Sequence, residues 1–94
     1  MNNTRFEIRF DPDAVKEYQQ LDNSVAKIVD KFLERLEKQA DEIGKPLHNT
    51  KSSRLAGCKE IKLRDAGVRI IFRVTNEVVE VLRVAYILAI EHRS

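Results

Sequence analysis

The chain has 94 residues, a length that fits one domain over residues 1–94 with a thin hydrophobic core. Its single cysteine excludes an internal disulfide. With no signal sequence and no apolar run near the ~20 residues of a membrane span, a cytoplasmic protein is expected. Residues 1–50 carry 8 basic and 10 acidic side chains, whereas residues 51–94 carry 9 and 5. The second half therefore favours a polyanionic ligand, or carries ordinary solvated charge.

The first patterned segment predicts a strand followed by a short helix. Apolar residues at every second position from Phe6 to Phe10 are typical of a half-buried strand. Asp11 suits the cap of a helix whose first residue is Pro12. The residues expected to face the core from this helix are Val15, Tyr18 and Leu21.

A second, longer helix is predicted to begin near Asp22 or Asn23 and to form a helical hairpin with the first. Its apolar residues recur at i, i+3, i+4 and i+7. They are Val25, Ile28, Val29, Phe32, Leu33 and Leu36. Gly44 and Pro46 are expected to end the helix, and residues 44–57 to form a loop.

A β-hairpin is predicted around a two-residue turn at Ala66-Gly67. In that register Arg64 lies opposite Arg69, and Glu60 opposite Arg73. One face is wholly apolar and comprises Ile61, Leu63, Val68, Ile70, Phe72 and Val74. The other face comprises Glu60, Lys62, Arg64, Arg69, Ile71 and Arg73.

A turn at residues 75–77 leads to a last strand over residues 78–90, which is apolar on both faces. That pattern indicates a central strand, with a bulge where the alternation changes. The predicted fold class is α+β, with a helical hairpin packed on a mostly antiparallel four-stranded sheet in the order β-α-α-β-β-β.

No phosphate-binding loop, metal-ligand cluster or Ser/Cys nucleophile motif is present, so neither a metal nor a cofactor is expected. His48 and His92 are more simply solvated than catalytic, and Cys58 more simply a small core residue. The positive signal is the basic hairpin face, because like charges placed opposite each other cost stability. Lys62, Arg64 and Arg69 therefore suggest an anionic ligand, although charge that only keeps the sheet soluble is the alternative.

The segments 58–64 and 67–72 resemble the central hairpin of RelE-family toxins, with a basic strand, a glycine-containing turn, then arginine among apolar residues. Residues 88–93 resemble the last strand of that family. The resemblance implies a ribosome-dependent, metal-independent cleavage of messenger RNA, in which the RNA 2′-hydroxyl attacks the adjacent phosphate. It implies that Lys62 acts as the base, that Arg69 grips the phosphate and that Arg93 acts on the leaving group. The neighbouring cations expected to contact RNA are Lys51, Arg54, Lys59 and Arg64.

The implied partners are a cognate antitoxin, the ribosome and messenger RNA, in a possible toxin–antitoxin hetero-oligomer and away from membranes. Two departures leave alternatives open. Glu60 stands where some RelE proteins have a further lysine, and related toxins often continue past the equivalent of Ser94 into a segment with an RNA-stacking tyrosine. The alternatives are a ParE-like, non-catalytic inhibitor of DNA gyrase and an inactive family member that acts only as a binding module.

Overall fold

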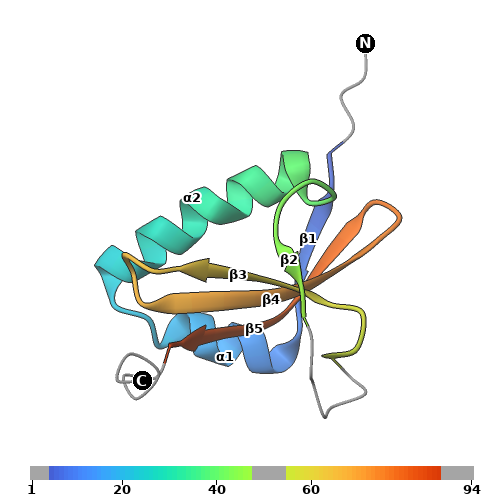
Figure 1. Ribbon diagram of the computed structural model, residues 1–94. Coiled ribbons are helices and arrows are strands. Elements are labelled where there is room, and N and C mark those ends of the chain that lie inside the picture. Colours follow the sequence, from blue (N-terminus) through green and yellow to red (C-terminus); the bar gives the residue numbers. More distant parts are fainter. Residues whose placement is uncertain (1–4, 48–54, 88–94) are drawn as a thin grey trace.

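The computed structural model describes residues 5–47 and 55–87, which form two helices and five strands (Figure 1). In chain order the elements are β1 (Glu7–Phe10), α1 (Pro12–Gln19), α2 (Asn23–Gln39), β2 (Lys45–Pro46), β3 (Lys59–Leu63), β4 (Val68–Thr75) and β5 (Val78–Tyr86). The α+β class and the helical hairpin are confirmed. No helix within these residues is long and apolar enough to cross a membrane.

The strands form a single sheet in the order β1-β5-β4-β3-β2. All neighbours are antiparallel except β1 and β5, which are parallel, so β5 is a central strand as predicted. The prediction of four strands was one short. The additional strand, β2, has only two residues, which is too few for a period-two pattern to reveal it inside the predicted loop.

Both helices cover the same face of the sheet, and the main core lies between them and the strands (Figure 1). Its most buried members are Ala14, Leu21, Val29, Leu36, Ala40, Val68, Ile70, Phe72, Val79, Val81 and Val84. Two expected core residues lie mainly at the surface, since Val15 is 37% exposed and Ile28 is 39% exposed. In the short helix α1 the inward position belongs to Ala14, because a small side chain lets the helix approach the sheet closely.

A side-chain cap marks the start of α1, and α2 ends before the residue that was expected to stop it. Asp11 caps α1 by accepting a hydrogen bond from the Asp13 N–H at 3.1 Å, with Pro12 in the first turn, as predicted. The second helix ends at Gln39, earlier than the predicted stop at Gly44. Gly44 instead lies at the turn into β2 with φ of +93°, where a Cβ atom would sit 3.0 Å from the Phe72 ring.

A bulge in β5 explains why that strand is apolar on both faces. Ile71 pairs with Arg83 and Phe72 with Val81, so Leu82 is an extra residue in the ladder. Leu82 lies on the outer face, as alternation from Val81 requires, and forms a second small cluster there with Cys58 and Ile71. The bulge changes the residues that follow: it keeps Arg83 away from the core, since an unbroken alternation from Val81 would direct that side chain beneath the helices.

Candidate RNA-binding surface

The hairpin of β3 and β4 carries the predicted site on the face of the sheet that the helices leave uncovered. Lys62 and Arg69 are direct partners across the two strands. The predicted register was wrong by two residues, because the turn spans residues 64–67 and not Ala66-Gly67 alone. A two-residue turn would require Ala66 to adopt positive φ, whereas in the longer turn glycine alone does so, at Gly67 with φ of +71°. A shift of two leaves every side chain on its predicted face.

The acidic residues of this face pair differently from the prediction. Glu60 accepts a hydrogen bond from Arg69, with 3.0 Å between Oε2 and Nη1, and does not pair with Arg73. Arg73 instead lies 3.5 Å from Glu80 on β5. The predicted cluster of three unpaired cations is therefore incorrect for Arg69. The Glu60 side chain is only 18% exposed and holds the Arg69 guanidinium in place.

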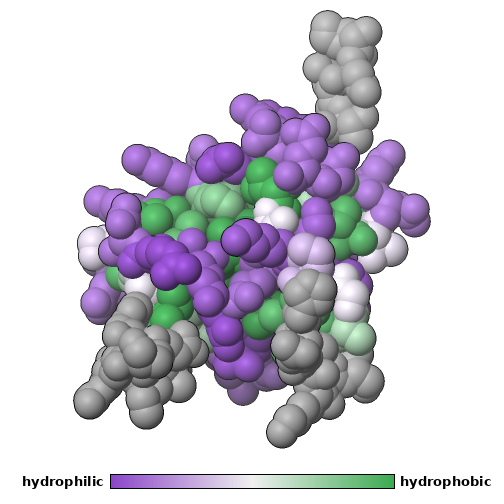
Figure 2. Space-filling view, viewed as in Figure 1, coloured by the Kyte–Doolittle hydropathy of each residue, from purple (hydrophilic) through white to green (hydrophobic). Residues whose placement is uncertain are grey.

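Lys62 and Arg64 are exposed and have no carboxylate partner in residues 5–47 and 55–87. Both line a pocket of about 630 Å³ at the edge of the sheet, beside β2. Its other walls are Phe32, Gly44, Lys45, Pro46, Leu47, Glu60 and Ile61. Figure 2 shows apolar surface between the hydrophilic residues over α2 and those over the strands. Lys45 is a third cation of this pocket, and sequence reasoning missed it because it assigned that residue to a loop.

Lys59 does not belong to this surface. Its Nζ donates hydrogen bonds of 3.3 Å to the backbone carbonyls of Ala40, Asp41 and Ile43, just after the end of α2. Period-two alternation already places Lys59 on the side of Ile61, opposite Lys62. Its structural role is therefore to satisfy backbone carbonyls of the segment that follows the helix.

Three predicted site residues lie outside the described residues, namely Lys51, Arg54 and Arg93. His48 and His92 lie outside them as well. Cys58 is buried in the small outer cluster, as expected for a core residue. Within the two described segments, no group of three or more His, Cys, Asp or Glu side chains could hold a metal ion.

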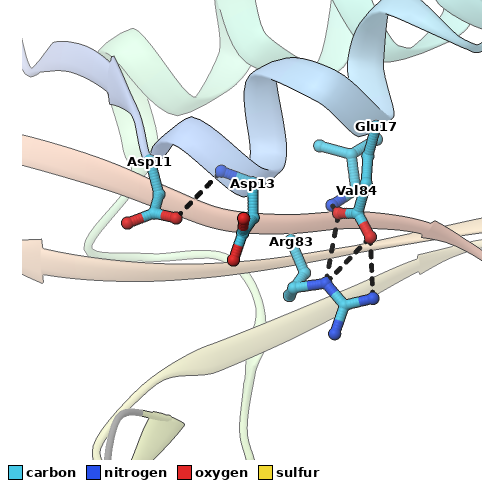
Figure 3. A network of polar contacts seen from close by, with 5 residues as sticks. All are labelled: Asp11, Asp13, Glu17, Arg83 and Val84. Carbon is cyan, nitrogen blue, oxygen red and sulfur yellow. Dashed lines mark hydrogen bonds and ion pairs between the residues drawn. The ribbon is translucent and has the colours of Figure 1, made fainter.

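Sequence reasoning also missed a half-buried carboxylate interaction between α1 and β5 (Figure 3). Glu17 on α1 binds the Arg83 guanidinium, with Oε2 2.7 Å from Nη2 and 2.9 Å from Nε. Its Oε1 accepts a 2.8 Å hydrogen bond from the Val84 N–H, in the part of β5 beyond the end of its pairing with β1. Partial burial alone would raise the pKa of Glu17, but the Arg83 and Val84 hydrogen bonds outweigh it and hold the pKa below 4.5.

The sequence matches the family described as the ParE toxin of the type II toxin–antitoxin system, parDE, over residues 8–94. A putative RelE-like toxin protein from Escherichia coli is 33% identical over 73 residues, which span 78% of this chain and 72% of that protein.

Solved structures show the same likeness. The isolated E. coli RelE toxin superposes with a TM-score of 0.68 at 31% identity, over 86% of this chain and 83% of RelE. A chain of the Mycobacterium tuberculosis RelBE2 toxin–antitoxin complex gives a TM-score of 0.71 at 25% identity, over 90% of this chain and 94% of that one. A ParDE protein of P. aeruginosa, 12% identical over 92% of this chain and 100% of that one, shares the fold with a TM-score of 0.70.

Proposed function

Because the chain belongs to the ParE toxin family of type II toxin–antitoxin systems, within the wider RelE/ParE group, we propose that it cleaves messenger RNA on the ribosome. The observation that carries this proposal is the direct pairing of Lys62 with Arg69 across β3 and β4, with Arg64 close by at the turn. Cations placed side by side on an uncovered sheet face suit the phosphate of a polyanion.

In the proposed reaction the 2′-oxygen of one nucleotide forms a bond to the adjacent phosphorus, and the bond from phosphorus to the 5′-oxygen breaks. As the free amine, Lys62 would take up the 2′-hydroxyl proton, while Arg69 stabilises the charge that builds on the phosphate oxygens. Glu60 would orient Arg69 before the substrate arrives, which is how preorganised donors gain their effect. Arg93 would protonate the leaving 5′-oxygen, and Arg64 would hold a neighbouring phosphate.

The test is single-turnover cleavage of a ribosome-bound message by purified variants. Arg69→Ala and Lys62→Met are each expected to lower the rate by about 100-fold or more. Arg73→Ala is the matched control, since Arg73 lies on the same face but beside Glu80. Glu60→Gln removes the ion pair but keeps the Arg69 guanidinium. Its rate therefore shows how much of the Arg69 effect depends on the orientation that Glu60 gives to the guanidinium. Equal rates for wild type and a folded Arg69→Ala variant would remove Arg69 from the mechanism.

The match to the ParE family favours a second candidate, a non-catalytic inhibitor of DNA gyrase. A gyrase supercoiling assay distinguishes the two candidates. Inhibition of gyrase, together with intact messages in expressing cells, would identify the protein as a gyrase inhibitor and not a ribonuclease. Binding to gyrase and to ribosomes without inhibition or cleavage would identify it as a binding module only.

A cognate antitoxin is the expected protein partner. We expect the toxin to be held inactive in a cytoplasmic complex with it. Structures of relatives include the E. coli RelBE toxin–antitoxin complex and RelE bound to an antitoxin RelBc peptide. An antitoxin that covers Lys62 and Arg64 would block RNA access to the proposed site. Co-expression with the small protein encoded next to this chain should then restore the growth that the toxin alone inhibits.

A further inference from the structure

We infer that the pocket beside β2 binds one nucleobase of the message, turned out of the strand next to the phosphate that Lys62 meets. This inference rests on the proposed function and concerns how the substrate is held. The pocket, called the edge pocket below, has a volume of about 630 Å³, and small-molecule sites commonly occupy about 300–1,000 Å³. Lys62 belongs both to its lining and to the proposed cleavage surface, so the two are continuous.

The backbone of Lys62 offers a donor and an acceptor on the side of β3 where the edge pocket lies. Alternate residues of an antiparallel strand direct their N–H and C=O groups to the same side. The Cys58 carbonyl accepts a hydrogen bond from Leu47, on the β2 side, so Glu60 and Lys62 face that side too. Because β2 pairs with β3 only at Lys59 and Glu60, Lys62 has no backbone partner there among the residues that the structure describes.

The length of this open edge favours a base over a peptide strand. Beyond Lys62 the chain enters the turn, where the Arg64 carbonyl accepts a hydrogen bond from the Gly67 N–H. In the described part of this edge, Lys62 is therefore the one residue past β2 whose donor and acceptor are both open. An added peptide strand forms hydrogen bonds along a run of edge residues. A nucleobase needs no more than one such pair, because it is bound through the donors and acceptors of its own edge.

The lining of the edge pocket suits a base and a phosphate together. Phe32, Pro46 and Ile61 provide apolar surface, against which a flat ring can pack. The lining cations without an ion pair among the described residues are Lys45, Lys62 and Arg64. Apolar walls beside unpaired cations complement a nucleotide, whose base is flat and whose phosphate is anionic.

A base seated in the edge pocket would also position the reacting group. It would hold the strand across the edge of β3, with the adjoining phosphate beside the Lys62–Arg69 pair that the proposed reaction uses. The groups that bind the base all belong to the protein. A single nucleotide should therefore bind to the isolated protein, without a ribosome.

The test compares AMP with ribose 5-phosphate, which carries the phosphate but lacks the base. Calorimetry on the purified full chain gives both affinities, and NMR follows the backbone amide of Lys62. AMP should bind at least about 10-fold more tightly, as expected when one base packs against a protein wall. The Lys62 amide proton should shift with AMP and not with ribose 5-phosphate.

Matched variants locate the base. Phe32→Leu, which keeps an apolar residue on α2, should lose most of the preference for AMP. Phe10→Leu makes the same change at another partly buried phenylalanine of the core and should keep the preference. Pro46→Ala, at an exposed position of β2, should weaken AMP binding and tests the same wall if Phe32→Leu does not fold.

Equal affinities of wild type for AMP and ribose 5-phosphate would overturn the inference. A preference for AMP that persists in the folded pocket variants would overturn it too, since the base would then bind elsewhere. If the Lys62 amide responds to an antitoxin peptide and not to AMP, the edge pocket is a protein-binding site and the inference is wrong. Failure of the proposed function has a different signature, because wild type would then cleave no message while the AMP titration still reports on the pocket.

Discussion

At the scale of single residues, Gly44 is restricted twice, by its backbone conformation and by its neighbour. Its φ of +93° disfavours any side chain, and a Cβ would meet the Phe72 ring at 3.0 Å. Gly57 shares the positive φ, at +80°, but has open space where its Cβ would lie. The pair of glycines therefore separates conformational strain from a packing clash.

Gly44→Ala is expected to lower the free energy of unfolding by about 2–4 kcal/mol, as strain and overpacking add. Gly57→Ala should cost only about 1–2 kcal/mol, the strain alone. Urea denaturation of both variants measures the difference. Equal losses would mean that Phe72 yields to the added methyl group without cost.

Glu17 predicts how stability depends on acid. Its folded pKa is below the unfolded value of 4.5, so its stabilising contribution is complete above that value and is lost as the pH falls through the folded pKa. Glu17→Gln should therefore lower the free energy of unfolding by about 1–2 kcal/mol at pH 7, and by progressively less below about pH 4.5.

The measurement is denaturation of wild type and variant at a series of pH values from 7 to 3. Glu34→Gln serves as the control and should have little effect at any pH, because Glu34 is exposed on α2 and has no ion pair with any residue that the structure describes. A stability difference between wild type and Glu17→Gln that stays constant across the series would show that the carboxylate charge is not what stabilises the contact.

At the scale of elements, Lys59 joins the end of α2 to β3. Three carbonyls after the helix receive its hydrogen bonds, so β3 fixes the chain that leads into β2 and the pocket. Lys62, three positions later on the opposite face, makes no such contact among the described residues. The two lysines of one strand thus have separate roles, which substitution can distinguish.

Lys59→Met should lower the free energy of unfolding by about 1–3 kcal/mol, because charged hydrogen bonds to carbonyls are lost. Lys62→Met should change it by about 0.5 kcal/mol or less, as most exposed substitutions do, while reducing RNA affinity. Chemical denaturation and RNA titration on the same samples give both quantities. The reverse pattern would restore Lys59 to the RNA-binding surface and remove Lys62 from it.

At the scale of the whole molecule, 94 residues and one helical layer give a core of modest size, so bound partners should contribute strongly to stability. A partner that binds only the folded state stabilises it by about 2.7 kcal/mol at a concentration 100 times its Kd. For a domain of this size that corresponds to a rise in Tm of about 10 °C or more.

We therefore expect the Tm of the toxin to rise by that amount on addition of its antitoxin, as followed by circular dichroism. An antitoxin from an unrelated pair is the control and should leave the Tm unchanged. Sedimentation verifies that the cognate antitoxin is bound at saturation. If the Tm is then unchanged, the complex forms without favouring the folded toxin.

Much of this fold follows from local patterns in the sequence. Asp11 and Pro12 fix the start of α1, and the alternation from Ile61 to Phe72 fixes the two faces of the hairpin, because a strand has a side-chain period of two. The assignment of side chains to the two faces was correct although the register was wrong by two residues. The same alternation also indicates that Lys59 points to the helix side of the sheet. The helical repeat in residues 25–36 fixed the buried side of α2 in the same way, with Ile28 as the exception.

What only the tertiary structure decided is which charges meet. Glu60 pairs with Arg69 because the length of the turn sets the register, and Glu17 meets Arg83 from 66 positions away because α1 packs where the pairing of β1 with β5 ends. β2 exists only because β3 offers it an edge. The sequence by itself thus determined the fold class and the outward basic face, since periodicity is local. Ion-pair partners depend on distances between elements, which no local pattern contains.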